Sequence, residues 1–98
     1  MLIKIQDKEY TLKYDINALA LLEDITGSLI SNALQENMGI AMLRNLFYVG
    51  LKRNHKDITV EQVGDIMQDY IDEHKSVERL SALITEAFEK SNLATEKK

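Results

Sequence analysis

Apolar and polar side chains alternate over residues 2–6 and 9–14, a period of two that is typical of β-strands with one buried face. A two-residue loop at Asp7 and Lys8 would place four apolar side chains on one side, pairing Ile5 with Tyr10 and Ile3 with Leu12. Lys8 is not the glycine that such a turn prefers, so a bulged or longer turn is an open alternative. A hairpin alone is marginal in water, and we therefore expect its apolar face to lie against helices.

Apolar positions at helical spacing follow the hairpin and predict helices over about residues 16–26, 29–35, 39–53, 60–73 and 77–91. The first helix should turn four side chains inward, namely Ala18, Leu19, Leu22 and Ile25. Asp15 and Ser76 suit helix N-caps, and Gly27 suits a helix end with positive φ. The strongest local signal is the capping box Thr59-Val-Glu-Gln62, which begins the fourth helix.

The stretch from residue 39 to 53 is apolar around most of its circumference. A helix with this pattern is normally buried, so we expect it at the centre with other elements on several sides. Its apolar side chains have two interpretations that the sequence leaves open. They are either core residues or, because a small domain has few elements to cover them, a partner-contact patch made of Phe47, Tyr48, Val49 and Leu51.

These patterns predict an α+β fold, predominantly helical, with an N-terminal β-hairpin over residues 2–14 packed on a four- to five-helix domain. A length of 98 residues fits one domain, which we expect to occupy residues 1–92. Residues 93–98 lack a pattern and are expected to form a flexible tail.

Composition narrows the classes of function. The formal net charge is −4 and neither half of the chain is basic, which disfavours nucleic-acid binding. The chain has no cysteine, which excludes disulfides and thiolate sites and is compatible with a reducing cytoplasm. No signal peptide is recognisable, and no apolar run approaches the ~20 residues that span a membrane.

No pattern for catalysis is present. His55 and His74 have no second ligand at a recognised metal spacing, and the four glycines are too far apart to form a phosphate loop. The sequence therefore predicts no catalytic, cofactor-binding or metal-binding residues, and no enzyme.

The helix expected over residues 60–73 carries five carboxylates, at Glu61, Asp65, Asp69, Asp72 and Glu73. Several are four residues apart, so like charges stack along one face at a cost of a few tenths of a kcal/mol per pair. A solvated face is the favoured interpretation. The functional alternative is a docking surface for a basic partner, in which Asp65 and Asp69 would take part.

The order of these motifs resembles the small tail assembly chaperones of long-tailed bacteriophages and related prophages. The matching segments are Tyr10-Thr-Leu12, Tyr14-Asp15-Ile-Asn-Ala18-Leu19, Leu22-Glu23 with Gly27, Val49-Gly50-Leu51, and Asp57-Ile-Thr59-Val-Glu61-Gln-Val63. The resemblance extends from the hairpin to the last helix.

The resemblance implies a nonenzymatic protein that binds the tape-measure protein and the tail-tube protein during tail morphogenesis. It implies action in the cytoplasm of the host cell and absence from the mature virion. Members are often made in two forms by a ribosomal frameshift, and Glu96-Lys97-Lys98 can be encoded by a slippery adenine run. A protein that shields long apolar helices is also expected to self-associate as a homo-oligomer.

A second class of function stays open on the sequence alone. The chain could be a small helical regulator or another interaction module of a mobile element. The net charge of −4 and the absence of a basic recognition helix argue against the regulator.

Overall fold

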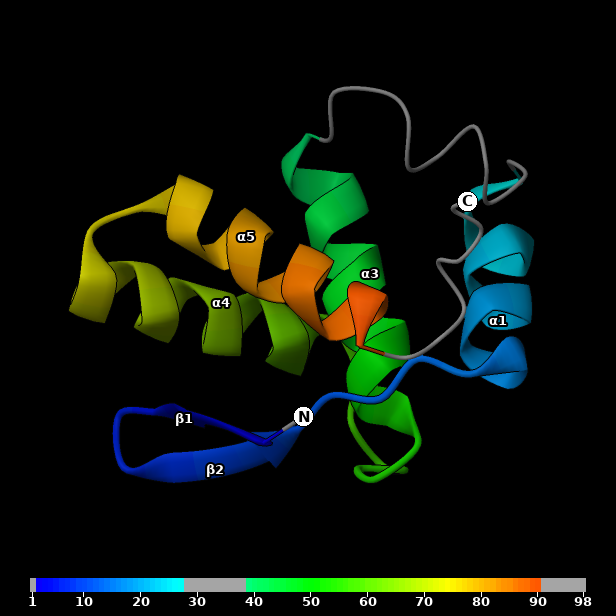
Figure 1. Cartoon of the computed structure of the whole chain (residues 1–98), viewed down its shortest axis with the longest axis horizontal. Helices are drawn as coiled ribbons and strands as arrows, with labels where there is room; N and C mark the ends of the chain where they lie inside the picture. The colour runs from blue at the N-terminus through cyan, green and yellow to red at the C-terminus, as the bar shows by residue number, and fades with distance from the viewer. Residues whose placement is uncertain (1, 28–38, 91–98) are drawn as a thin grey trace.

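The computed structural model describes residues 2–27 and 39–90 and confirms the α+β, mostly helical fold class (Figure 1). The described elements are β1 (Leu2–Ile5), β2 (Lys8–Thr11), α1 (Ile16–Thr26), α3 (Ile40–Lys52), α4 (Val60–His74) and α5 (Val77–Glu89). The bounds of these four helices lie within two residues of the sequence-based expectations. The helix expected over 29–35 and the tail expected over 93–98 lie outside the described residues.

The hairpin has a different turn from the one expected. β1 and β2 are antiparallel, with Ile5 opposite Lys8 and Ile3 opposite Tyr10, so the loop consists of Gln6 and Asp7. Both loop residues have positive φ, 50° and 70°, as a type I′ turn requires. The expected register was wrong by two residues. A shift of two keeps every side chain on its face, and the apolar side of the hairpin therefore still meets the helices.

Side-chain caps define the helix ends where the sequence placed them. Asp15 accepts from the N–H of Ala18 across 2.9 Å, and Ser76 accepts from the N–H of Arg79. The capping box at the start of α4 has both of its hydrogen bonds, from Gln62 N–H to the Thr59 hydroxyl and from Thr59 N–H to the Gln62 side chain. These caps satisfy backbone groups that no helical partner can reach.

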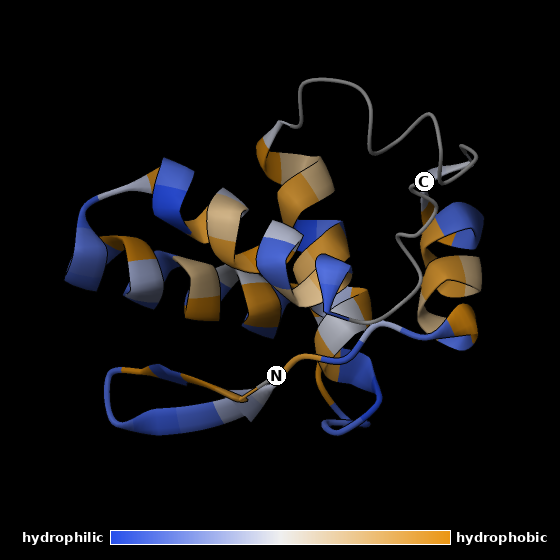
Figure 2. Cartoon of the chain, viewed as in Figure 1, coloured by the Kyte–Doolittle hydropathy of each residue, from blue (hydrophilic) through white to orange (hydrophobic). Residues whose placement is uncertain are grey.

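Helix α3 is the centre of the packing, as its pattern indicated. It contacts α1, α4, α5 and β2, and hydrophobic residues run along it in Figure 2. Its buried residues are Leu43, Leu46, Phe47, Val49, Gly50 and Leu51. The other elements each contribute an apolar face to this core.

The connection from β2 to α1 crosses α3 at close range. The N–H of Lys13 donates to the carbonyl of Gly50 across 2.8 Å, and the hydroxyl of Tyr14 donates to the carbonyl of Leu46 across 2.7 Å. Tyr14 is 2% exposed, and its ring meets that of Phe88 edge-on. These bonds fix the hairpin on one side of α3 and α1 on another.

One expected core position in α1 was wrong. Ala18 and Leu22 are buried and Leu19 is half-buried, but Ile25 is 41% exposed. Ile25 lies in the last turn of the helix, where the neighbouring elements cover it only in part.

Candidate partner-binding groove

An open groove of about 520 Å³ lies between β2, the loop after α3, and α4. Strand β2 contributes Lys8 and Tyr10, and the loop contributes residues 55–58. Helix α4 contributes four side chains, Gln62, Asp65, Ile66 and Asp69. The groove therefore combines apolar surface from Tyr10, Ile58 and Ile66 with the carboxylates of Asp65 and Asp69 on the α4 wall, while the β2 and loop walls carry Lys8, Lys56 and Asp57.

Two polar contacts set the position of the hairpin relative to α4. At the turn, the Gln6 backbone N–H donates to Oε1 of Glu73 across 3.2 Å, and the Gln6 side chain donates to the carbonyl of Asp69 across 3.1 Å. At the other end of the strand, the N–H of Thr11 donates to Nε2 of His55 across 3.2 Å. These bonds join the turn of the hairpin to α4 and the other end of β2 to the loop after α3.

His55 organises the loop wall of the groove. Its own N–H donates to the carbonyl of Leu51 at the end of α3, across 2.9 Å. Its imidazole lies 5.8 Å from the ring of Tyr10, centre to centre. Nε2 of His55 accepts the N–H of Thr11 through its ring lone pair, which joins the loop to the end of β2.

The pKa of Tyr10 depends on its surroundings in the groove. Burial raises the pKa of the Tyr10 phenol, and the negative charge of Asp69 raises it further. The phenol is therefore protonated at neutral pH and can donate a hydrogen bond.

Carboxylates form a ridge beside the groove along α4. Glu61, Asp65, Asp69 and Glu73 are four residues apart and exposed, which places them on one side of the helix. Helix α4 contains no Lys or Arg. In the described part of the chain, no ion pair or hydrogen bond engages the side chains of Asp65 and Asp69.

The structure separates the candidate contact residues into two groups. Phe47, Val49 and Leu51 are at most 1% exposed, because the residues before α1 and the other helices pack around α3. This corrects the contact-patch interpretation for those three residues, which belong to the core. Tyr48 is half-buried, with the Lys52 ammonium 5.6 Å from its ring centre, while Asp65 and Asp69 line the groove.

Sequence reasoning missed the opposite wall of the groove. The sequence pattern places His55 in a loop and gives it no second metal ligand, and it indicates only packing positions for Tyr10 and Ile58. Thr11 and His55 are 44 residues apart, so no local pattern connects them. A sequence signal was present only for the carboxylate ridge.

Within residues 2–27 and 39–90, no three His, Cys, Asp or Glu side chains lie close enough together to hold a metal ion. In the same residues, no helix combines the length and the apolar character needed to cross a bilayer.

The fold and the groove define a small α+β chain in which a hairpin and an acidic helix flank an open polar and apolar surface. The chain belongs to the family described as a domain of unknown function (DUF5055), whose model matches residues 1–98. No curated protein and no solved structure matches the chain.

Proposed function

We propose that this protein is a tail assembly chaperone of a long-tailed phage or prophage, which binds the tape-measure protein and the tail-tube protein. The observation that carries the proposal is the ordered set of motifs described above. Tyr14-Asp15 both caps α1 and crosses α3, and Thr59-Val-Glu-Gln62 begins the helix that carries the acidic ridge. Two of the motifs, Tyr10-Thr-Leu12 and Asp57-Ile-Thr59-Val-Glu61-Gln-Val63, contribute residues to the groove, and the others lie elsewhere in the fold.

The chaperone would act by reversible contact in the cytoplasm of the host cell and would leave before the virion is complete. Apolar surface at Tyr10, Ile58 and Ile66 would shield aggregation-prone segments of the client. The charges at Asp65 and Asp69 would favour rapid exchange, because exposed ion pairs are weak and screened by salt.

The genomic context gives the first test. The DNA through codons 96–98 and downstream should contain a slippery adenine run, an overlapping frame and then a very long helical reading frame. The protein from that long frame should stay soluble when it is expressed with this chain and should co-purify with it. An unrelated downstream gene without overlap, together with a long protein that fails to co-purify, would refute the chaperone proposal.

Variants of groove residues test whether the long protein binds at the groove. Asp65→Asn with Asp69→Asn should reduce the amount of long protein recovered. The matched control is Glu78→Gln with Glu89→Gln, which makes the same change in net charge on exposed positions of α5. Equal recovery with both double variants would remove the groove from the proposal.

Self-association belongs to the same proposal. Light scattering of the purified chain over a range of concentrations should show a mass above 11.2 kDa. A constant monomer mass at high concentration would remove the homo-oligomer and leave the client-binding role to be judged by co-purification.

A further inference from the structure

The outer edge of β2 faces the groove. The N–H of Thr11 points away from β1, because it donates to His55 in the loop wall. Backbone groups in an antiparallel pair alternate between the two edges of a strand, so the N–H and C=O of Glu9, two residues earlier, face the same way. In the described part of the chain, no hydrogen bond from another element reaches Glu9.

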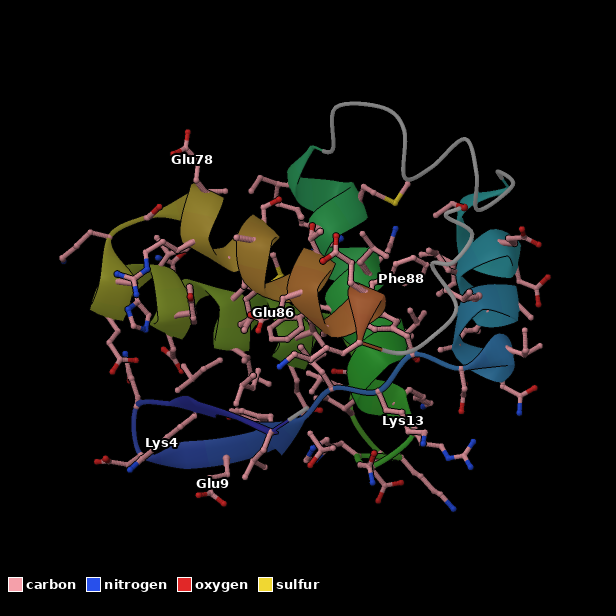
Figure 3. All side chains as sticks on the ribbon, in the orientation of Figure 1. Lys4, Glu9, Lys13, Glu78, Glu86 and Phe88 are labelled. Carbon is pink, nitrogen blue, oxygen red and sulfur yellow. The ribbon has the colours of Figure 1, made fainter. Side chains whose placement is uncertain are left out.

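The side chains of β2 also alternate in a way that leaves this edge accessible. Figure 3 shows the side chains of Lys4 and Glu9 on the face of the hairpin away from the helices. Tyr10 and Lys8 lie on the other face and line the groove. A chain added beside β2 would therefore place every second side chain towards α4.

The spacing of the acidic ridge fits such a chain. Residues four apart in a helix are separated by about 6 Å along its axis. Side chains on one face of an extended strand are separated by about 6.6 Å. Each second side chain of the added strand would therefore lie close to one carboxylate, first Asp65 and then Asp69.

We propose that the groove binds an extended, basic segment of a partner protein, which adds a third strand at the Glu9 edge of β2 and sets alternate Lys or Arg side chains against Asp65 and Asp69. Main-chain hydrogen bonds would give affinity, and the alternate cations would give specificity. Apolar side chain stems of those residues would lie on Tyr10 and Ile66.

Charge complementarity favours a basic partner segment over a second copy of this chain. The ridge carries four like charges along one side of α4, and a row of cations would relieve their mutual repulsion. A second copy of this chain offers one cation, Lys8, on the groove-facing side of its own β2. Lys8 and Lys56 line the β2 and loop walls of the groove, so it is the α4 wall, with Asp65 and Asp69, that is complementary to a different, more basic chain.

The inference builds on the proposed function, because the groove would be the client surface of the chaperone. The probe is a fluorescein-labelled seven-residue peptide in which lysine alternates with valine. Its binding to the full chain is measured by fluorescence anisotropy at low salt and at 0.5 M salt. A second peptide has the same composition with the lysines and valines in separate blocks. A third carries N-methyl groups on the backbone amides that would pair with Glu9.

The alternating peptide should bind, and both comparison peptides should bind at least fivefold more weakly. Asp65→Asn with Asp69→Asn should raise the Kd of the alternating peptide by about five- to tenfold at low salt. The control pair Glu78→Gln and Glu89→Gln should change it less than twofold, and circular dichroism should show all variants folded. Salt at 0.5 M should weaken the binding of the wild-type chain most.

Equal binding of the N-methylated peptide would overturn strand addition, and equal effects of the two double variants would overturn the acidic ridge as its partner. Loss of self-association in Asp65→Asn with Asp69→Asn, together with no peptide binding by the wild-type chain, would assign the groove to self-association instead. Loss of peptide binding with intact co-purification of the long protein refutes this inference alone. Peptide binding without co-purification refutes the chaperone proposal alone.

Discussion

Replacing Gly50 by alanine tests the close crossing of the connection over α3. A Cβ built at Gly50 would lie 2.7 Å from both Cζ and the hydroxyl oxygen of Tyr14 and 2.8 Å from a methyl carbon of Leu12. Favourable contacts between such atoms are at about 3.5–4.0 Å. The new methyl group therefore overlaps two buried side chains from different directions by about 1 Å.

Neither neighbour has room to move away. The Tyr14 hydroxyl donates to the carbonyl of Leu46, and the Lys13 N–H donates to the carbonyl of Gly50 itself. Leu12 is 1% exposed and packs within the same core. Relief of the overlap requires the connection to lift from α3, with loss of at least one of these hydrogen bonds.

Two opposing free energies decide the outcome. Alanine in a helix interior is favoured over glycine by about 1 kcal/mol. Overpacking of a core costs typically about 1–3 kcal/mol, and a lost hydrogen bond adds about 1 kcal/mol. We expect Gly50→Ala to reduce the free energy of unfolding by about 2 kcal/mol, which corresponds to a fall in Tm of roughly 8–16 °C for a chain of this size.

Gly64 in α4 provides the matched control. The nearest atom to a Cβ at Gly64 is Cδ of Arg44 at 3.5 Å, an ordinary contact. Gly64→Ala should therefore raise the free energy of unfolding by about 0.5–1 kcal/mol through helix propensity alone. Urea unfolding followed by circular dichroism at 222 nm measures both variants. A Gly50→Ala variant as stable as Gly64→Ala would refute the close crossing.

The remaining predictions concern single contacts. Tyr14→Phe should lower the free energy of unfolding by about 1 kcal/mol at neutral pH, because the hydrogen bond to Leu46 is lost. Burial raises the pKa of Tyr14 above the ordinary 10.0, so above about pH 10 the unfolded state ionises while the folded state keeps its proton. Wild-type stability should then fall with rising pH by up to about 1.4 kcal/mol per unit from this group, and Tyr14→Phe should lack that slope in urea titrations from pH 9 to 11. Thr59→Ala should cost about 1 kcal/mol in urea unfolding by removing the N-cap of α4, whereas Thr59→Ser should cost little. Asp7→Gly should raise the free energy of unfolding by about 0.5 kcal/mol, and Tm with it, because Asp7 has φ of 70° in the turn. No change in Tm would indicate that the aspartate is unstrained there.

Local chemistry made the helices predictable. Asp15, Thr59 and Gly27 act on backbone groups within a few residues of themselves, so their roles were readable without any knowledge of the fold. The apolar pattern of α3 likewise predicted its central place, since a helix that is apolar around most of its circumference is normally buried.

The features that the sequence did not predict depend on contacts between residues far apart in the chain. The turn at Gln6 and Asp7 carries neither glycine nor asparagine, and its anchor is Glu73 in α4. The choice between core and contact patch for Phe47 depended on what covered α3. The wall formed by His55 depended on a hydrogen bond to Thr11. Sequence periodicity contains no information about such pairs.

The anchoring of the hairpin has a consequence for the order of folding during synthesis. Its hydrogen bonds join Tyr14 to Leu46, Thr11 to His55 and Gln6 to Glu73, with sequence separations of 32, 44 and 67 residues. A two-stranded hairpin is marginal alone, and distant contacts form only after the intervening chain is available. On the ribosome, residues 2–14 emerge before α3 and α4 and have no partners until these helices have followed. The hairpin is therefore translated before these helices but packs natively only after them, and a ribosome stalled before residue 74 would carry a hairpin still without its anchor at the turn.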